Sequence, residues 1–114
     1  MNIYKMKLQA KYFDFIKNGT KRIEIRLNDP KRQLIKIGDI IEFTKLPELK
    51  DSFKVEVIDL LHYNSFKDLI NDFDIELLAN KNVSKEDLIK ILEEIYSKDE
   101  EMLYGVLGIK IKLL

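Results

Sequence analysis

Three charged residues, Lys21, Glu24 and Arg26, are the side chains of this sequence best placed to do chemistry. They lie in residues 19–26, which alternate between apolar and charged residues like a β-strand. The alternation puts Glu24 and Arg26 on one face, two residues apart, so their carboxylate and guanidinium are expected to pair. Lys21 falls on the apolar face, where it must occupy the mouth of the core or a cavity unless the turn rotates it away. The alternative is an exposed strand that carries a solvated ion pair.

Lys21 is also the one candidate for covalent or acid–base catalysis. His62 is the only histidine and cysteine is absent, which excludes histidine-based triads, cysteine nucleophiles and zinc sites built from cysteines or several histidines. A nucleophilic lysine must be neutral; Glu24 opposes neutrality and the nearby basic residues promote it. Residues 99–101, an acidic run, are interpreted as a solvated helix segment, so no metal or cofactor is expected.

The elements that position these residues follow from turn and capping patterns. A helix is predicted over residues 11–17, and Gly19 is predicted to end it in the left-handed conformation before the charged strand begins. Helix 85–96 carries apolar residues at helical spacing, Leu88, Ile91, Leu92 and Ile95, which are interpreted as a core stripe. The other predicted elements are strands over residues 3–8, 40–45, 53–61 and 107–113, a short edge segment over 33–37, and helices capped by Ser65 and Ser84.

Composition predicts one soluble domain over residues 1–114. Hydrophobic residues make up 46% of the 114, enough for a single core. The absence of cysteine favours a cytoplasmic location, no signal peptide is recognised, and no apolar run approaches the ~20 residues of a membrane span.

Charge is balanced overall but unevenly distributed. A net charge of zero argues against a protein that coats nucleic acid nonspecifically. Residues 17–36 hold seven basic against two acidic residues, whereas residues 65–104 hold eleven acidic against five basic. Such a chain would steer an anionic ligand toward its basic end; the alternative is that both stretches are ordinary solvated faces.

Four segments, in order, resemble the ASCH-domain family in its small single-domain prokaryotic form. Gly19, Lys21, Glu24 and Arg26 fit the family pattern glycine-x-lysine-x-x-glutamate-x-arginine, and residues 37–43, 63–66 and 104–111 resemble its later segments. The resemblance implies an α+β fold similar to PUA domains, with a small β-barrel of about five to six strands flanked by short helices. It also implies binding of RNA or nucleotides.

One branch of that family resembles a small amidohydrolase that removes acyl groups from modified cytidine. The resemblance implies a catalytic lysine, a threonine two positions before the arginine, and a more distant glutamate. Lys21 matches the lysine, but Glu24 stands in the place of the threonine, and no distant glutamate aligns. The sequence therefore departs from that catalytic pattern.

The combined prediction is a cationic cleft around Lys21, Glu24 and Arg26 that binds a nucleotide or a short single-stranded RNA. Lys21 and Arg26 would meet phosphate or base oxygens, and Glu24 would accept hydrogen bonds from a base amine or a ribose hydroxyl. The other predicted ligand contacts are Lys17, Asn28, Arg32 and Tyr104, with Tyr63, Tyr96 or Tyr104 as a stacking face.

Two alternatives remain open. One is a small amidohydrolase or nuclease in which Lys21 and Glu24 are catalytic, and the other is an interaction module whose acidic helices contact a protein partner. No membrane partner is expected and no signal specific for DNA is present. If Lys21 is a confined charge, Lys21→Met is expected to leave stability unchanged or to raise it.

Overall fold

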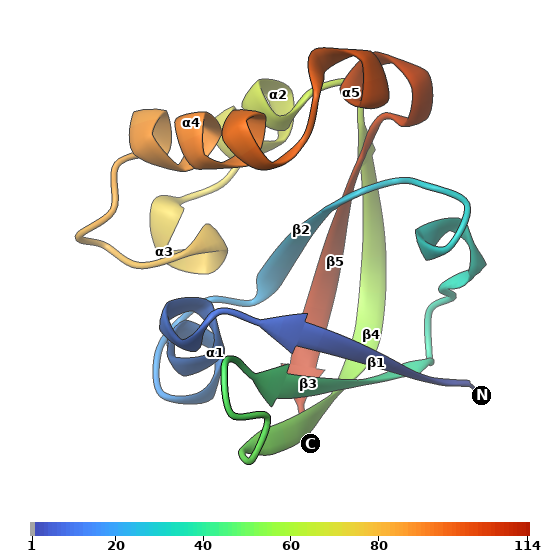
Figure 1. Cartoon of the computed structure of the whole chain (residues 1–114), viewed down its shortest axis with the longest axis vertical. Helices are drawn as coiled ribbons and strands as arrows, with labels where there is room; N and C mark the ends of the chain where they lie inside the picture. The colour runs from blue at the N-terminus through green and yellow to red at the C-terminus, as the bar shows by residue number, and fades with distance from the viewer. Residues whose placement is uncertain (1) are drawn as a thin grey trace.

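The computed structural model describes residues 2–114, which form five strands and several short helices (Figure 1). The strands are β1 (Ile3–Leu8), β2 (Ile23–Leu27), β3 (Ile40–Lys45), β4 (Ser52–Tyr63) and β5 (Val106–Leu113). The helices are α1 (Ala10–Lys17), α2 (Phe66–Asn71), α3 (Ile75–Leu78), α4 (Lys85–Ile95) and α5 (Lys98–Tyr104), with a 3₁₀ helix, η1 (Arg32–Leu34).

The strands form one curled sheet in the order β1-β3-β4-β5-β2. Strand β1 runs parallel to β3, and all other neighbours are antiparallel. The curl makes a half-open barrel whose two edge strands, β1 and β2, are not paired with each other (Figure 1). The predicted α+β barrel is confirmed, and the seam between β1 and β2 is its open side.

Two apolar clusters stabilise this arrangement. One fills the half-barrel, and the other lies where helices α2 and α4 cover the far ends of β2 and β5. Strand β5 contributes to both, with Leu107, Ile109 and Ile111 in the first cluster and Val106 in the second. Lys110 and Lys112 of the same strand are exposed, as the alternation predicts.

The predicted helix starts are confirmed at both serines. Ser65 Oγ accepts a hydrogen bond from Asp68 N, and Ser84 Oγ accepts one from Asp87 N, each at 3.0 Å. These bonds satisfy amide groups that a helix leaves without an intrahelical partner. They fix where α2 and α4 begin, and therefore how α4 lies over the sheet.

Two local predictions are wrong. Residues 33–37 do not form an edge segment; the chain turns into η1, where Asp29 Oδ1 accepts from Arg32 N at 3.0 Å and caps the turn. Gly19 is not left-handed, since the positive-φ glycines are Gly38 and Gly105. A glycine is needed at this position because the backbone passes close to Phe15: a Cβ on residue 19 would lie 2.8 Å from the Phe15 carbonyl oxygen.

Across residues 2–114, no helix combines the length and the apolar character needed to cross a membrane.

Candidate ligand-binding site

The three charged residues of the first strand motif form one buried cluster. Glu24 accepts from Arg26 Nε at 2.8 Å through one oxygen, and its other oxygen lies 3.3 Å from Lys21 Nζ. Lys21 is 2% exposed and Glu24 6% exposed. The expected Glu24–Arg26 pair is present, and the alternative of a solvated strand is wrong.

Lys21 uses all three of its N–H donors inside the protein. Besides Glu24, its Nζ donates to the carbonyl oxygens of Ile23 at 2.6 Å and Leu78 at 2.8 Å. Burial lowers the pKa of Lys21, Glu24 opposes that shift, and Arg26 adds to it. The net effect is a lowered pKa, but three acceptors around one amine match the three donors of an ammonium group, so the geometry favours the charged form of Lys21.

The same contacts lead us to expect the opposite outcome for Lys21→Met. The sequence-based expectation treated Lys21 as a confined charge whose removal is neutral or stabilising. In the structure, methionine would leave two buried carbonyls without their donor and Glu24 without one of its two cations. Such losses destabilise a fold.

Glu24 remains ionised despite its burial. Burial alone would raise the pKa of its carboxyl, but the charges and hydrogen bonds of Lys21 and Arg26 together outweigh it and hold the pKa below the ordinary value. A carboxylate has about four acceptor positions, and these two partners leave some of them free.

Arg26 connects the two edges of the half-barrel. Its Nε holds Glu24 on its own strand, while its Nη2 donates to the Lys7 carbonyl oxygen of β1 at 3.1 Å. Its side chain is 15% exposed. Two of its five N–H donors have these partners, so the others can meet a ligand at the seam.

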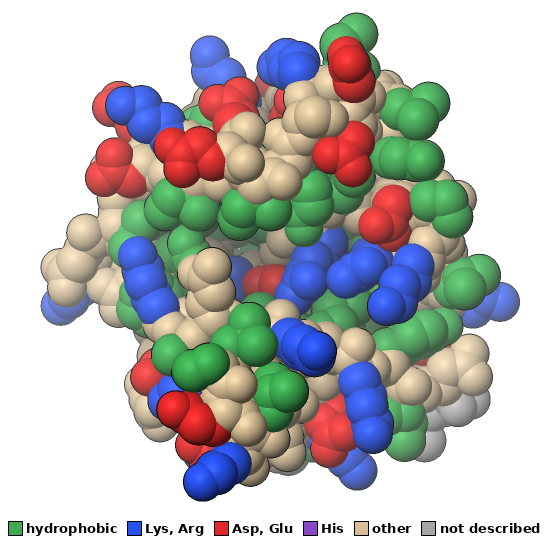
Figure 2. Space-filling view, viewed as in Figure 1, with side chains coloured by type: hydrophobic (Ala, Val, Ile, Leu, Met, Phe, Trp, Pro, Cys, Tyr) green, Lys and Arg blue, Asp and Glu red, His purple; other side chains and the backbone are tan. Residues whose placement is uncertain are grey.

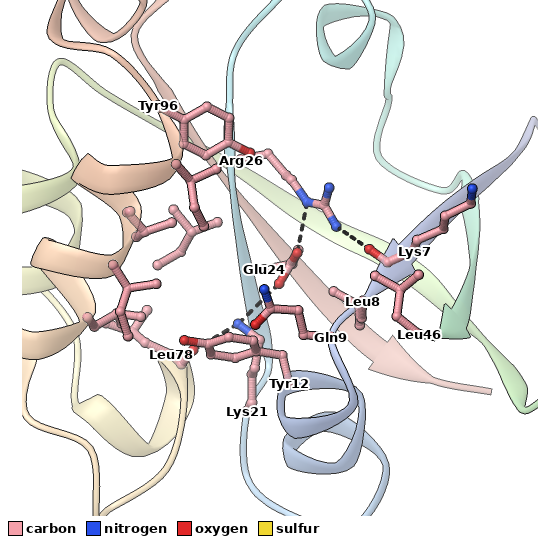
Figure 3. A pocket seen from close by; sticks show the side chains of 15 residues that line it. Lys7, Leu8, Gln9, Tyr12, Lys21, Glu24, Arg26, Leu46, Leu78 and Tyr96 are labelled. Carbon is pink, nitrogen blue, oxygen red and sulfur yellow. Dashed lines mark hydrogen bonds and ion pairs between the residues drawn. The ribbon is translucent and has the colours of Figure 1, made fainter. Parts of the chain in front are cut away.

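A cavity of about 190 Å³ lies over this cluster. Figure 3 shows Lys21, Glu24 and Arg26 in a row between Tyr12 and Tyr96. Figure 2 shows the hollow from outside, with hydrophobic side chains along one rim and basic ones beside it. The apolar wall is formed by Leu78 of α3 and by residues of and next to α4: Leu88, Ile91, Leu92, Ile95 and Tyr96. The cavity therefore has a charged floor and an apolar wall.

Tyr12, from α1, is a cavity residue with an unsatisfied hydroxyl. The Tyr12 ring lies edge-on to the Phe15 ring, with 5.8 Å between the two centroids. Lys21 Nζ lies 5.8 Å from the centroid of the Tyr12 ring. Within residues 2–114 the hydroxyl has no hydrogen-bond partner. Burial, and then the charge of Glu24, raises the pKa of Tyr12, so the hydroxyl stays protonated and remains a donor.

Segment 20–22 attaches helix α3 to the strand that carries the cavity floor. Three successive carbonyl oxygens, those of residues 76–78, accept hydrogen bonds from Thr20 Oγ1, Arg22 N and Lys21 Nζ, each at 2.8 Å. A cation at the carboxyl end of a helix is also favoured by the helix dipole. Lys21 thus joins the charged floor to the wall of the cavity.

The remaining predicted contacts lie elsewhere. Lys17 is exposed at the end of α1. Arg32 lies in a shallow groove beside β1 and pairs with Asp29 at 3.7 Å. Asn28 and Tyr104 line a separate open groove, and Tyr96 is the one of the three candidate tyrosines that lines the cavity. The structure brings together Lys21, Glu24 and Arg26 and separates the others from them.

The apolar wall was not predicted from the sequence. Leu88 and Leu92 of α4 are buried as predicted, although both also line the cavity. Ile91 is only partly buried, and Ile95 is 57% exposed at the rim. The core-stripe interpretation is therefore wrong for the outer half of the stripe. The length of the apolar stripe could have indicated this wall, because the stripe continues to Tyr96 at the end of the helix.

The acidic run 99–101 is not simply solvated. Glu101 is buried and accepts from Phe66 N at 2.8 Å, so it caps α2, and Lys98 lies 3.3 Å from its other oxygen. Among residues 2–114 no group of three or more potential metal ligands comes together.

The sequence that forms this fold matches the model of a known family. A model of the ASCH domain covers residues 6–114. The chain belongs to the ASCH-domain family.

Two solved structures are similar to this chain. Hypothetical protein PH0355 of Pyrococcus is 38% identical, with a TM-score of 0.85 and 100% of both chains covered. Protein PF0455 from Pyrococcus furiosus is 35% identical, with a TM-score of 0.78, covering 98% of this chain and 97% of its own. No protein with a curated function matches.

Proposed function

We propose that this ASCH domain binds RNA or a nucleotide by taking one unstacked base into the cavity between β2 and α4. The observation that carries the proposal is the Glu24–Arg26 pair on the floor of an apolar-walled cavity, with donors of Arg26 still free. The general association of ASCH domains with RNA binding agrees with it.

The size of the cavity supports a small flat ligand. Its 190 Å³ is below the ~300–1,000 Å³ of pockets for drug-sized ligands. A duplex cannot enter such a space, whereas an unstacked base of a single strand can be splayed out into it. The apolar wall and Tyr96 would cover the faces of the base.

The polar groups complement the edges of a base. Free acceptor positions on Glu24 suit an exocyclic amine or ring N–H, and the free N–H groups of Arg26 suit a base carbonyl or a phosphate. Lys21 contributes indirectly, since its donors are already used and it holds Glu24 in place. The same engagement disfavours Lys21 as a nucleophile, which would need a neutral amine.

The test is a thermal-shift screen with nucleosides, nucleotides and single-stranded RNA hexamers, followed by calorimetric titration of each hit and chromatography of the recovered ligand. We expect stabilisation by at least one nucleotide or RNA and recovery of unchanged ligand, because any ligand of the native state must stabilise it. A flat screen would contradict the proposal, and product formation would favour the enzymatic alternative.

Arg26→Lys sharpens the test. Lysine keeps the positive charge near Glu24 but lacks the planar fork, so we expect affinity to fall about 10- to 100-fold. Lys112→Gln is the control, because it removes an exposed charge on β5 that does not line the cavity. Equal affinity of Arg26→Lys and the wild type would place the ligand elsewhere.

A further inference from the structure

A second, basic depression continues from the rim of the cavity along β1. Lys7 lines the cavity, and Lys5, two residues earlier on the same face of β1, lines a shallow groove of about 240 Å³. Lys31 and Arg32, at the start of η1, line that groove from the other side. Figure 2 shows basic side chains following one another away from the hollow.

We propose that a single-stranded RNA with one base in the cavity leaves it along β1 toward η1, with its phosphates on Lys7, Lys5, Lys31 and Arg32. This inference rests on the proposed function and extends it, because it assigns the ligand to oligonucleotides instead of free nucleotides. Lys5 and Lys7 are ~6.6 Å apart along the strand, so they present a spaced row of charges.

Electrostatics favours this exit over the other groove. The groove of Asn28 and Tyr104 includes the carboxylates of Asp68 and Glu101, which repel phosphate. The groove along β1 has no carboxylate among its lining residues, and none of the ion pairs among residues 2–114 involves Lys5, Lys7 or Lys31. Acidic residues near this groove include Asp29, paired with Arg32, Glu42, opposite Lys5 on β3, and Asp39, which accepts from the backbone amides of Asn2 and Lys36.

The basic groove is also well ordered by the fold. The Tyr4 hydroxyl donates to the Leu34 carbonyl oxygen at 3.1 Å, which holds η1 against β1. Arg32 Nε is buried and has no hydrogen-bond partner within the described residues. A groove whose basic walls are held in place by the fold suits phosphate.

The experiment compares ligand lengths and salt dependence. Mononucleotides and single-stranded RNA hexamers of the same base are titrated into the wild type at several salt concentrations. We expect hexamers to bind more tightly and their log affinity to fall more steeply with log salt, by about 0.7 per phosphate contacted. The double variant Lys5→Gln/Lys31→Gln should reduce the hexamer slope by about 1.4 and leave mononucleotide affinity unchanged.

The control is Lys110→Gln/Lys112→Gln, which removes two exposed lysines from β5 and should change neither affinity. Mononucleotide binding without any gain for hexamers would overturn this inference and leave the proposed function standing. An equal loss in both double variants would also overturn the path along β1. Failure of mononucleotides and hexamers alike to bind the wild type would count against the proposed function itself.

Discussion

Glu24 and Glu101 are both buried carboxylates, yet their surroundings differ. Glu101 accepts from the Phe66 amide and pairs with an exposed lysine, Lys98. Glu24 is held between two cations, Lys21 and Arg26, beside a cavity. Capping of α2 fully explains the first arrangement. The second contains more charge and more free hydrogen-bonding capacity than the fold requires.

The difference separates structural charge from charge available to a ligand. A capping carboxylate is satisfied by the backbone that it caps. At the seam, Arg26 keeps free donors, Glu24 keeps free acceptor positions, and the Tyr12 hydroxyl has no partner, all around one cavity. Substitutions in the two regions should therefore differ in whether they change stability alone or binding as well.

Lys21→Met should have the largest effect on stability. It breaks a buried pair and leaves two carbonyls unpartnered, so we expect a loss of about 3–5 kcal/mol in the free energy of unfolding, measured by urea denaturation. Lys98→Met, which removes the exposed partner of Glu101, should cost under about 1 kcal/mol. A Lys21→Met protein as stable as the wild type would mean that Glu24 does not need this cation.

Glu24→Gln should reduce stability by about 1–3 kcal/mol at pH 7 and abolish ligand binding, because both cations lose their counter-charge. Glu101→Gln, whose amide oxygen can still accept from Phe66 N, should leave binding intact. Titration calorimetry and urea denaturation of the two variants measure both effects. If the Glu24→Gln variant bound the ligand as strongly as the wild type, the Glu24 carboxylate would not contact the ligand.

The pH dependence follows from the lowered pKa of Glu24. Its contribution to stability is present above the ordinary value of 4.5 and is lost as pH falls through the lower pKa of the folded state. The wild type should therefore lose stability below about pH 4.5, and Glu24→Gln should lose less in that window. Asp39→Asn is the control for the curve of stability against pH. Hydrogen bonds from Asn2 N and Lys36 N also lower the pKa of Asp39, so this carboxyl contributes to the acid loss as well. This variant should flatten the acid loss without changing ligand affinity.

Tyr12→Phe should have the smallest effect on stability. Removing an unpartnered hydroxyl costs nothing, so we expect a melting temperature equal to or above that of the wild type, and an affinity about 3- to 10-fold lower if the hydroxyl meets the ligand. Tyr4→Phe is the matched control, because it removes a hydroxyl bonded to Leu34 and should lower the melting temperature slightly without affecting binding. A drop in melting temperature for Tyr12→Phe would show that the hydroxyl is satisfied within the fold.

Local patterns in the sequence predicted much of the fold and part of the site. Period-two alternation places Glu24 and Arg26 together, and the serine caps fix α2 and α4, because these relations involve neighbours within a few residues. Alternation also predicted Lys21 at the mouth of the core or in a cavity, and Lys21 is buried and lines the cavity. Its hydrogen-bond partners could not be derived in this way, because strand β2 begins only at Ile23 and one of the acceptors, Leu78, lies 57 residues away.

The apolar wall of the cavity could not be predicted for a different reason. Periodicity identifies which face of α4 is apolar, but it does not say how far the sheet beneath extends. Leu92 lies over the core, whereas Ile95 projects past it to the rim of the cavity. The boundary between core and binding surface is a property of tertiary packing that no single helix encodes.

The attachment of α3 to segment 20–22 has a consequence for motion. A helix of four residues, Ile75–Leu78, has no stability of its own, so it persists through the donors supplied by Thr20, Lys21 and Arg22. Because Lys21 is also a partner of Glu24, releasing α3 disturbs the carboxylate as well. We therefore expect the floor and this part of the wall to open as one cooperative unit, so that the amide hydrogens of α3 and of the start of β2 exchange with solvent together.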